Sequence, residues 1–488
     1  MAPLLMIAAS ATLFIPLLAY CLLALWDLAK SRKWAHIPGP SVVAPLGYVG
    51  LGSQPHLRAA QYCAKYGPVC RLRLGREHAV AVTDPVLVAG VLGAGADGLH
   101  DKFEDLYAAW PFLGAKKTAF LSSGANPDWR FMRGKLQHPF SISNMRQAYP
   151  GIVGCTKQLV DFVEGAAEGQ ELEMDVLFRQ YSLSVMLRVF FNTGIDVDKY
   201  KGELSRHMTR AVGDMKWPAS GVPGPDSSDS FAWLTDFFHF MAQLTQSKAV
   251  APGEESRQLW AALASVKGMD VDALQAHIGF LLVAGHDSVA AAIGWSLYCL
   301  ATHPNWQVKV ARELQAARIG EKWDAEALEY SDVMGLRVLY KVVLEAMRLY
   351  PANPTGTLRK LNQDRQVGKH LLPKGTALWV PTYAVHRSAA NWDAPAAFDP
   401  ARWDAENASE GRRGGKRYIP FGSGPRACLG QALAMAEVQT ALAALLAKSA
   451  FRLAPGMSSN GDEVATFRGT LGFQGGLRMV AGRRGDKA

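Results

Sequence analysis

Cysteine is scarce in this chain of 488 residues, with six thiols at positions 21, 63, 70, 155, 299 and 428. None of them forms a Cys-x-x-Cys pair, which argues against a disulfide framework and against a zinc site. Scattered thiols fit a reducing compartment. The chain is too long for one ordinary core, so it predicts either two domains or one large domain filled by a ligand.

A concentrated basic patch is also missing. The formal net charge is +9, yet lysine and arginine are dispersed, and neither a basic helix nor an aromatic-basic motif is present. The sequence therefore argues against a nucleic-acid partner. An acidic protein partner or an anionic membrane surface accounts for the charge equally well.

Charge is absent from residues 1–26, which are mostly Leu, Ala, Ile and Phe. About 24 helical residues span roughly 36 Å, enough for a bilayer core. A cleaved signal peptide is the alternative, but the run is long and has no basic segment before it. We predict a transmembrane anchor over 1–28, a basic and proline-rich hinge over 29–44, and a catalytic domain over 45–488. Basic residues directly after the anchor place that domain in the cytoplasm.

The sequence also argues against an internal nicotinamide-binding domain. Gly93–Gly98 fits a Gly-x-Gly-x-x-Gly pattern, but it follows a predicted helix capped by Asp84 and not a strand. The glycines therefore end a helix, and electrons must come from another protein. Before that helix, Val69–Leu74 and Ala79–Val82 predict a β-hairpin.

Cys428 lies in the segment Phe-Gly-Ser-Gly-Pro-Arg-Ala-Cys-Leu-Gly, residues 421–430, just before an apolar helical pattern. Unpaired amide groups and the positive end of a helix dipole meet there, which favours thiolate over thiol. A lone cysteine is more often a buried small hydrophobe. The spacing Phe-x-x-Gly-x-Arg-x-Cys-x-Gly fixes five positions in ten, which makes chance occurrence on the order of one in a million.

This segment resembles the cysteine loop of the cytochrome P450 family, the membrane-anchored haem-thiolate monooxygenases. The resemblance implies a mainly α fold with small β-sheets, in which a helical domain buries the haem behind an N-terminal transmembrane helix. It implies that Cys428 is the axial ligand of the haem iron and that Arg426 meets a haem propionate. Phe421, Gly422 and Gly430 complete the implied cofactor loop.

The stretch Val271–Leu300 is nearly uncharged, and we predict a long buried helix. Its centre contains an acid and a hydroxyl, Asp287 and Ser288, which are costly to bury without partners. The alternatives without a catalytic role are a helix N-cap and a serine hydroxyl that hydrogen-bonds to its own backbone. The resemblance implies that Ala284 and Gly285 make room for oxygen and that Asp287 and Ser288 deliver protons. Ser288 stands where the family usually has threonine.

The remaining site residues rest on the resemblance. It implies that Trp129, Arg133 and Arg359 support the haem propionates, and that Glu345, Arg348 and Arg402 form a buried structural triad. Candidates for the substrate pocket are Ala352, Asn353, Thr355, Leu471 and Phe473. Short β segments are predicted over 371–380 and 469–479. The loop 217–230 resembles a lid over the substrate path, and the basic loop 411–417 is either solvated surface or a docking patch for a reductase.

The implied activity is insertion of one oxygen atom from O2 into a lipophilic substrate such as a fatty acid, sterol or terpenoid. The implied cofactor is haem b, supplied with electrons by NADPH-cytochrome P450 reductase, with cytochrome b5 as an optional second donor. The implied setting is a monomer on the endoplasmic reticulum membrane. The alternatives are a reductase-independent haem-thiolate isomerase or dehydratase, and a haem-binding sensor or carrier.

Overall fold

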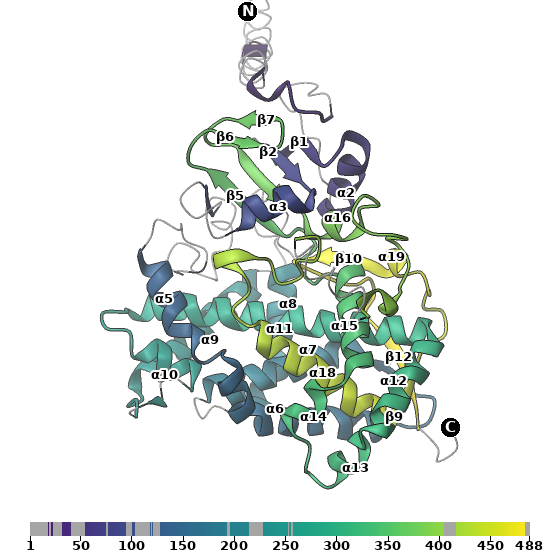
Figure 1. Ribbon diagram of the computed structural model, residues 1–488. Coiled ribbons are helices and arrows are strands. Elements are labelled where there is room, and N and C mark those ends of the chain that lie inside the picture. Colours follow the sequence, from purple (N-terminus) through teal and green to yellow (C-terminus); the bar gives the residue numbers. More distant parts are fainter. Residues whose placement is uncertain are drawn as a thin grey trace, which may run out of the picture.

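Figure 1 shows the computed structural model, which describes residues 32–40, 54–74, 77–93, 100–102, 127–192, 196–213, 228–251, 257–404 and 416–483, with a few short stretches between them (18, 21–22, 118, 120 and 253–254). The predicted anchor and most of the loops 217–230 and 411–417 therefore lie outside the described residues. So does the predicted glycine-rich segment after Gly93.

The core is built around one long helix, α11 (Val271–Thr302). It packs against α7 (Met174–Val185), α9 (Ser228–Ser247), α15 (Arg337–Leu349) and α18 (Gln431–Lys448). Asp270 caps its first turn by accepting a hydrogen bond from the amide of Ala273. Within the described residues, α11 is the helix long and apolar enough to cross a membrane, but 67% of its most apolar window is buried. This confirms the prediction of a buried central helix.

The other helices surround this axis (Figure 1). They are α2 (Pro55–Tyr66), α3 (Pro85–Leu92), α5 (Pro127–Gln137), α6 (Ile142–Glu164), α8 (Val197–Gly213), α10 (Leu259–Ala264), α12 (Pro304–Ala316), α13 (Ile319–Asp324), α14 (Tyr330–Met334), α16 (Thr382–Arg387) and α19 (Gly461–Val464). A π-helical turn, η4 (Met186–Phe191), extends α7. Three short 3₁₀ turns are η1 (Arg32–Trp34), η7 (Pro400–Trp403) and η8 (Gly424–Arg426).

The β-structure is a minority element; its largest sheet lies at the end of the molecule that carries α2 and α16, whereas β9 and β12 lie near α12 toward the other end (Figure 1). The largest sheet has the order β1-β2-β8-β5-β3, formed by Val69–Leu74, Glu77–Val82, Ala377–Val380, Thr357–Leu361 and His100–Lys102. Two strand pairs are β6 (Arg365–Val367) with β7 (His370–Leu372) and β10 (Ala465–Arg468) with β11 (Thr470–Phe473). A third sheet joins β4 (Glu171–Glu173), β12 (Arg478–Arg483) and β9 (Ser449–Leu453).

Local sequence signals placed several of these elements correctly. The predicted hairpin is the antiparallel pair β1 and β2, with Val69 opposite Val82. The helix α3 begins at Pro85, and the Asp84 carboxylate accepts hydrogen bonds from the amides of Val86 and Leu87. Both predictions are confirmed, because turn and capping residues act over a few neighbours only.

Three buried histidines make the fold sensitive to acid. Burial lowers the pKa of His56 and His286 to about 4 and that of His386 to about 3. A lowered pKa in the folded state means that the unfolded chain binds protons first, so these groups reduce stability as the pH falls below about 6.5. Buried Glu437 acts in the opposite direction, because its pKa is raised well above the usual value.

We therefore expect His386→Gln to flatten the dependence of stability on pH. Glutamine can still accept the hydrogen bond that the Ile419 amide donates to Nε2 of His386 at 2.8 Å. Between pH 7 and pH 5 the wild type should lose about 2 kcal/mol more unfolding free energy than the variant. Urea unfolding followed by circular dichroism at both pH values measures the difference, and equal losses would contradict the expectation.

Candidate active site

A cavity of about 360 Å³ lies between the centre of α11 and the loop before α18. Its lining includes Cys428, Ser288, Trp129 and both Arg133 and Arg426. Apolar side chains fill most of the remaining wall, among them Phe120, Phe280, Leu281, Val289, Ala292 and Met347. The cavity thus joins a thiol, a hydroxyl and two guanidinium groups inside an apolar enclosure.

The cysteine loop is fixed by its own backbone. The amide of Cys428 donates to the carbonyl oxygen of Phe421 at 2.8 Å, which closes the loop. Gly422 and Gly424 have φ angles of 69° and 72°, in the left-handed region. A Cβ atom on Gly424 would lie 1.7 Å from the carbonyl oxygen of Leu92, so only glycine fits there. The loop therefore depends on α3 as well as on its own sequence.

The Cys428 side chain is open to the cavity, although the residue lies deep in the protein. Burial raises the pKa of its thiol, and the amide of Gly430 and the charge of Arg133 offset only part of that effect. Our expectation that this place favours the thiolate is therefore wrong for the protein without a metal. The loss of hydration on burial raises the pKa of the Cys428 thiol more than the nearby amide lowers it. A bound metal cation would make the thiolate the stable form.

Cationic and aromatic groups gather beside the thiol. The Arg426 guanidinium stacks on the Trp129 ring at 3.7 Å from its centroid. Arg133 donates to the carbonyl oxygen of Ala427 at 2.7 Å, which ties α5 to the cysteine loop. Burial lowers the pKa of Arg133, with Cys428 acting in the opposite direction. Trp129 is only 5% exposed, so this cluster is an internal one.

The acid and the hydroxyl of α11 point in different directions. Ser288 lines the cavity, and its hydroxyl donates to the carbonyl oxygen of Ala284 at 2.7 Å. Asp287 is not among the lining residues. Its carboxylate instead accepts hydrogen bonds from Nε of Arg179 at 3.1 Å and from the hydroxyl of Thr470. Neighbouring positions on a helix lie about 100° apart, which separates the two groups.

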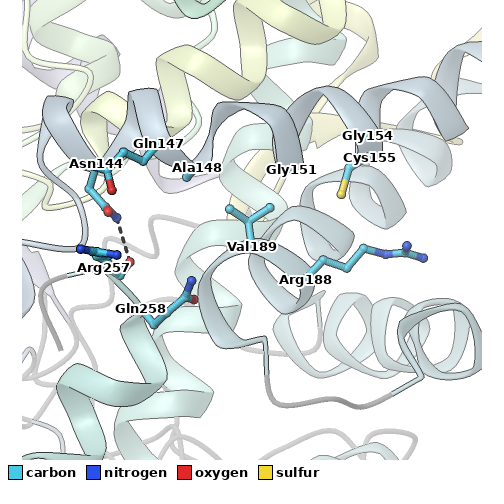
Figure 2. A pocket seen from close by; sticks show the side chains of 10 residues that line it. All are labelled: Asn144, Gln147, Ala148, Gly151, Gly154, Cys155, Arg188, Val189, Arg257 and Gln258. Atoms are coloured by element: carbon cyan, nitrogen blue, oxygen red, sulfur yellow. Dashed lines mark hydrogen bonds between the residues drawn. The ribbon is translucent and has the colours of Figure 1, made fainter. Parts of the chain in front are cut away.

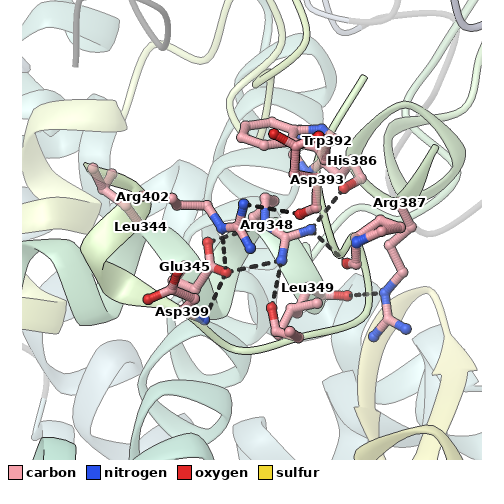
Figure 3. A network of polar contacts seen from close by, with 12 residues as sticks. Leu344, Glu345, Arg348, Leu349, His386, Arg387, Trp392, Asp393, Asp399 and Arg402 are labelled. Atoms are coloured by element: carbon pink, nitrogen blue, oxygen red, sulfur yellow. Dashed lines mark hydrogen bonds and ion pairs between the residues drawn. The ribbon is translucent and has the colours of Figure 1, made fainter. Parts of the chain in front are cut away.

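Glu345, Arg348 and Arg402 form one network that joins α15 to η7 (Figure 3). Glu345 and Arg348 are fully buried and form a two-bond ion pair of 2.8 and 3.0 Å. Nε of Arg402 donates to Glu345 at 2.8 Å. The amide of Asp399 and the indole of Trp403 satisfy the rest of the carboxylate. Glu345 and Arg348 are thus the buried centre of this network.

Four predicted residues lie elsewhere. Arg359 is buried on β5 and does not line the cavity. Thr355 is buried just before β5 and does not line the cavity either, and its carbonyl accepts a hydrogen bond from the Trp379 indole. Leu471 and Phe473 pack on Trp295, with the Phe473 and Trp295 ring centroids 4.0 Å apart. Trp295 lies two helical turns beyond Ser288, so Leu471 and Phe473 meet α11 past the cavity. Ala352 and Asn353 do line it, as do Ala284, Gly285, Phe421, Gly422 and Gly430.

Two charged groups at the site were not predicted from the sequence. Glu437 lines the cavity from α18 and is fully buried, and burial raises the pKa of its carboxyl well above the usual value. Arg179 lies on α7, 108 residues before Asp287 in sequence. The sequence did contain a signal for Glu437, because it is an acidic residue on an otherwise apolar face of α18. Nothing local could have revealed the second.

A separate cavity of about 530 Å³ lies between α6, η4 and residues 257–258 (Figure 2). Its one thiol, Cys155, has a pKa raised to about 12 by burial, so it is an unreactive group. Polar side chains such as Asn144, Gln147 and Gln258 also line this cavity. This cavity lacks the combination of thiol and apolar enclosure found beside α11.

Comparison with known proteins agrees with this site. The family model described as Cytochrome P450 matches residues 37–464. Cytochrome P450 3A9 of Rattus norvegicus is 27% identical, covering 85% of each chain. Cytochrome P450 734A5 of Oryza sativa subsp. japonica is 28% identical over 80% of this chain and 75% of its own. Cytochrome P450 27C1 of Danio rerio is 25% identical over 88% and 83%. With its mainly helical fold and its cavity beside Cys428, the chain belongs to the cytochrome P450 family, the haem-thiolate monooxygenases.

Proposed function

We propose that the chain inserts one oxygen atom from O2 into a lipophilic small molecule, with haem b held by Cys428. The observation that carries the proposal is the cavity that places the Cys428 thiol opposite the centre of α11 within a mostly apolar wall. Fatty acids, sterols and terpenoids share the chemistry this wall can bind. Electrons come from NADPH through a separate reductase.

The residues present fit the cofactor. Arg133, Arg426 and Trp129 line the cavity and provide the cationic, hydrogen-bonding edge that two propionates require. Gly285 and Ala284 keep the facing helix thin where the ring would lie. When bound through a thiolate, haem activates O2 and favours cleavage of the O–O bond. The protein orients the substrate beside it and excludes water.

Proton delivery is the role we assign to Asp287 and Ser288. The Ser288 hydroxyl faces the cavity, whereas the Asp287 carboxylate is 16% exposed and ion-paired with Arg179. Asp287 must therefore exchange one of its partners before it can pass a proton inward. Because the ion pair with Arg179 restrains Asp287 in this way, a reductase-independent isomerase stays the second candidate function.

Asp287→Asn is expected to lower product formation by about a hundredfold, the usual effect of losing a general acid. Haem content and the reduced carbon-monoxide spectrum should stay unchanged, because Asp287 does not line the cavity. The rate of product formation with NADPH and an added reductase provides the measurement. Asp236→Asn, an exposed acid on α9, is the matched control. Unchanged turnover in Asp287→Asn would remove the assigned role.

Consumption of O2 and NADPH decides between the two candidate functions. A monooxygenase consumes both in step with product when reductase is present. An isomerase or dehydratase converts a peroxide substrate without either. We propose that the reaction takes place at the endoplasmic reticulum membrane, with residues 1–28 as the anchor.

A further inference from the structure

A third cavity, of about 800 Å³, is lined by Arg179, the residue that is ion-paired with Asp287. It is formed by α7, α8 and the β10–β11 hairpin, and four of its lining residues are arginines: Arg179, Arg206, Arg210 and Arg468. Arg206, Arg210 and Arg468 are exposed, so the cavity opens at the surface. Nothing in the proposed oxygen chemistry uses these three arginines.

The charges around this cavity do not balance. Arg179 is ion-paired with Asp175 at 2.8 Å and with Asp287 at 3.1 Å. No acidic side chain in the described part of the chain pairs with the other three arginines. Arg206 and Arg210 stand one turn apart on α8, where like charges destabilise a helix. Among the described residues, four guanidinium groups thus face two carboxylates, an arrangement that an anion carrying two charges would neutralise.

We propose that this cavity binds a phosphate-bearing ligand through Arg206, Arg210 and Arg468. Guanidinium groups form paired hydrogen bonds to phosphate oxygens, and their fork geometry suits phosphate better than a single point charge does. The hydroxyls of Ser205 and Thr209 also line the cavity and can donate to the same oxygens. The ligand is either a soluble phosphate compound or the head group of a phospholipid.

The test measures binding to the full-length chain by isothermal titration calorimetry at low ionic strength. Inorganic pyrophosphate represents the soluble source, and short-chain dihexanoyl phosphatidic acid represents the lipid source. In the variant R206Q/R210Q/R468Q both dissociation constants should rise by about tenfold or more, since hydrogen bonds to charged groups are the strong ones. The control R58Q/R312Q/R337Q removes three exposed arginines from other helices and should bind like the wild type.

The outcomes separate the sources and can overturn the proposal. Tighter binding of pyrophosphate identifies a soluble ligand, and tighter binding of phosphatidic acid identifies a head group, provided the first triple variant loses it. The proposal fails if neither probe binds, or if the two triple variants bind equally. It also fails if R206K/R210K/R468K binds as tightly as wild type, because general charge attraction would then suffice. Unchanged reduced carbon-monoxide spectra show that each variant is folded.

Discussion

Replacing Cys428 by alanine is expected to abolish the haem-thiolate spectrum and all oxygen insertion. Cys428 is the thiol that lines the α11 cavity, and its loop is held by backbone bonds that alanine keeps. The variant should therefore fold but lack the axial ligand. The measurement is the absorption spectrum of the reduced, carbon-monoxide-bound protein together with product formation.

Two further variants make this result decisive. Cys428→Ser keeps the size of the side chain and should give the same loss. Cys299→Ala is the control, since Cys299 is a buried thiol on α11 with a pKa raised by burial. It should retain both spectrum and turnover. A Cys428→Ala protein with a wild-type spectrum would end the assignment of this residue as the iron ligand.

Glu345→Gln is expected to destabilise the protein by about 3–5 kcal/mol, the usual cost of breaking a buried ion pair by removing one partner. Arg348 is fully buried and would keep its charge without a carboxylate. Arg402 would lose the same partner. Urea unfolding gives the free energy, and haem content after expression gives the effect on the cofactor site.

The control for this change is Glu321→Gln. Glu321 also pairs with an arginine three residues away, Arg318, but both side chains are largely exposed. Water can replace that contact, so stability should not change measurably. Equal stability of the Glu345 and Glu321 variants would mean that the network of Figure 3 does not hold the fold together.

Much of the fold followed from the sequence because its signals are local. The hairpin at 69–82, the capped helix at 85 and the apolar helix from 271 each depend on residues close in sequence. The loop around Cys428 was also evident, because its glycines and its cysteine act within ten residues. The spacing of residue types is enough to predict the structure wherever the interacting residues are close in sequence.

The rest depended on three-dimensional arrangement. Asp287 and Ser288 are adjacent in sequence, but their side chains enter different surroundings, and Arg179 reaches Asp287 from another helix. The pKa of Cys428 was predicted in the wrong direction, because amides near a helix start are visible in a sequence whereas the depth of burial is not. Phe473 was a candidate for the substrate pocket, yet it packs on Trp295.

The hub at Glu345 also bears on the order in which the molecule assembles. Apart from Arg348, the hydrogen-bond partners of Glu345 come from positions 54 to 58 residues further along the chain, and the Tyr418 hydroxyl donates to the neighbouring Leu344 carbonyl across 74 residues. Contacts between such distant segments form late, since long chain closures cost entropy before they yield any contact. We therefore expect the segment leading to the cysteine to be set in place only after the helices have docked. Cofactor capture would then be a closing step of biosynthesis, because a nascent chain would have no complete site.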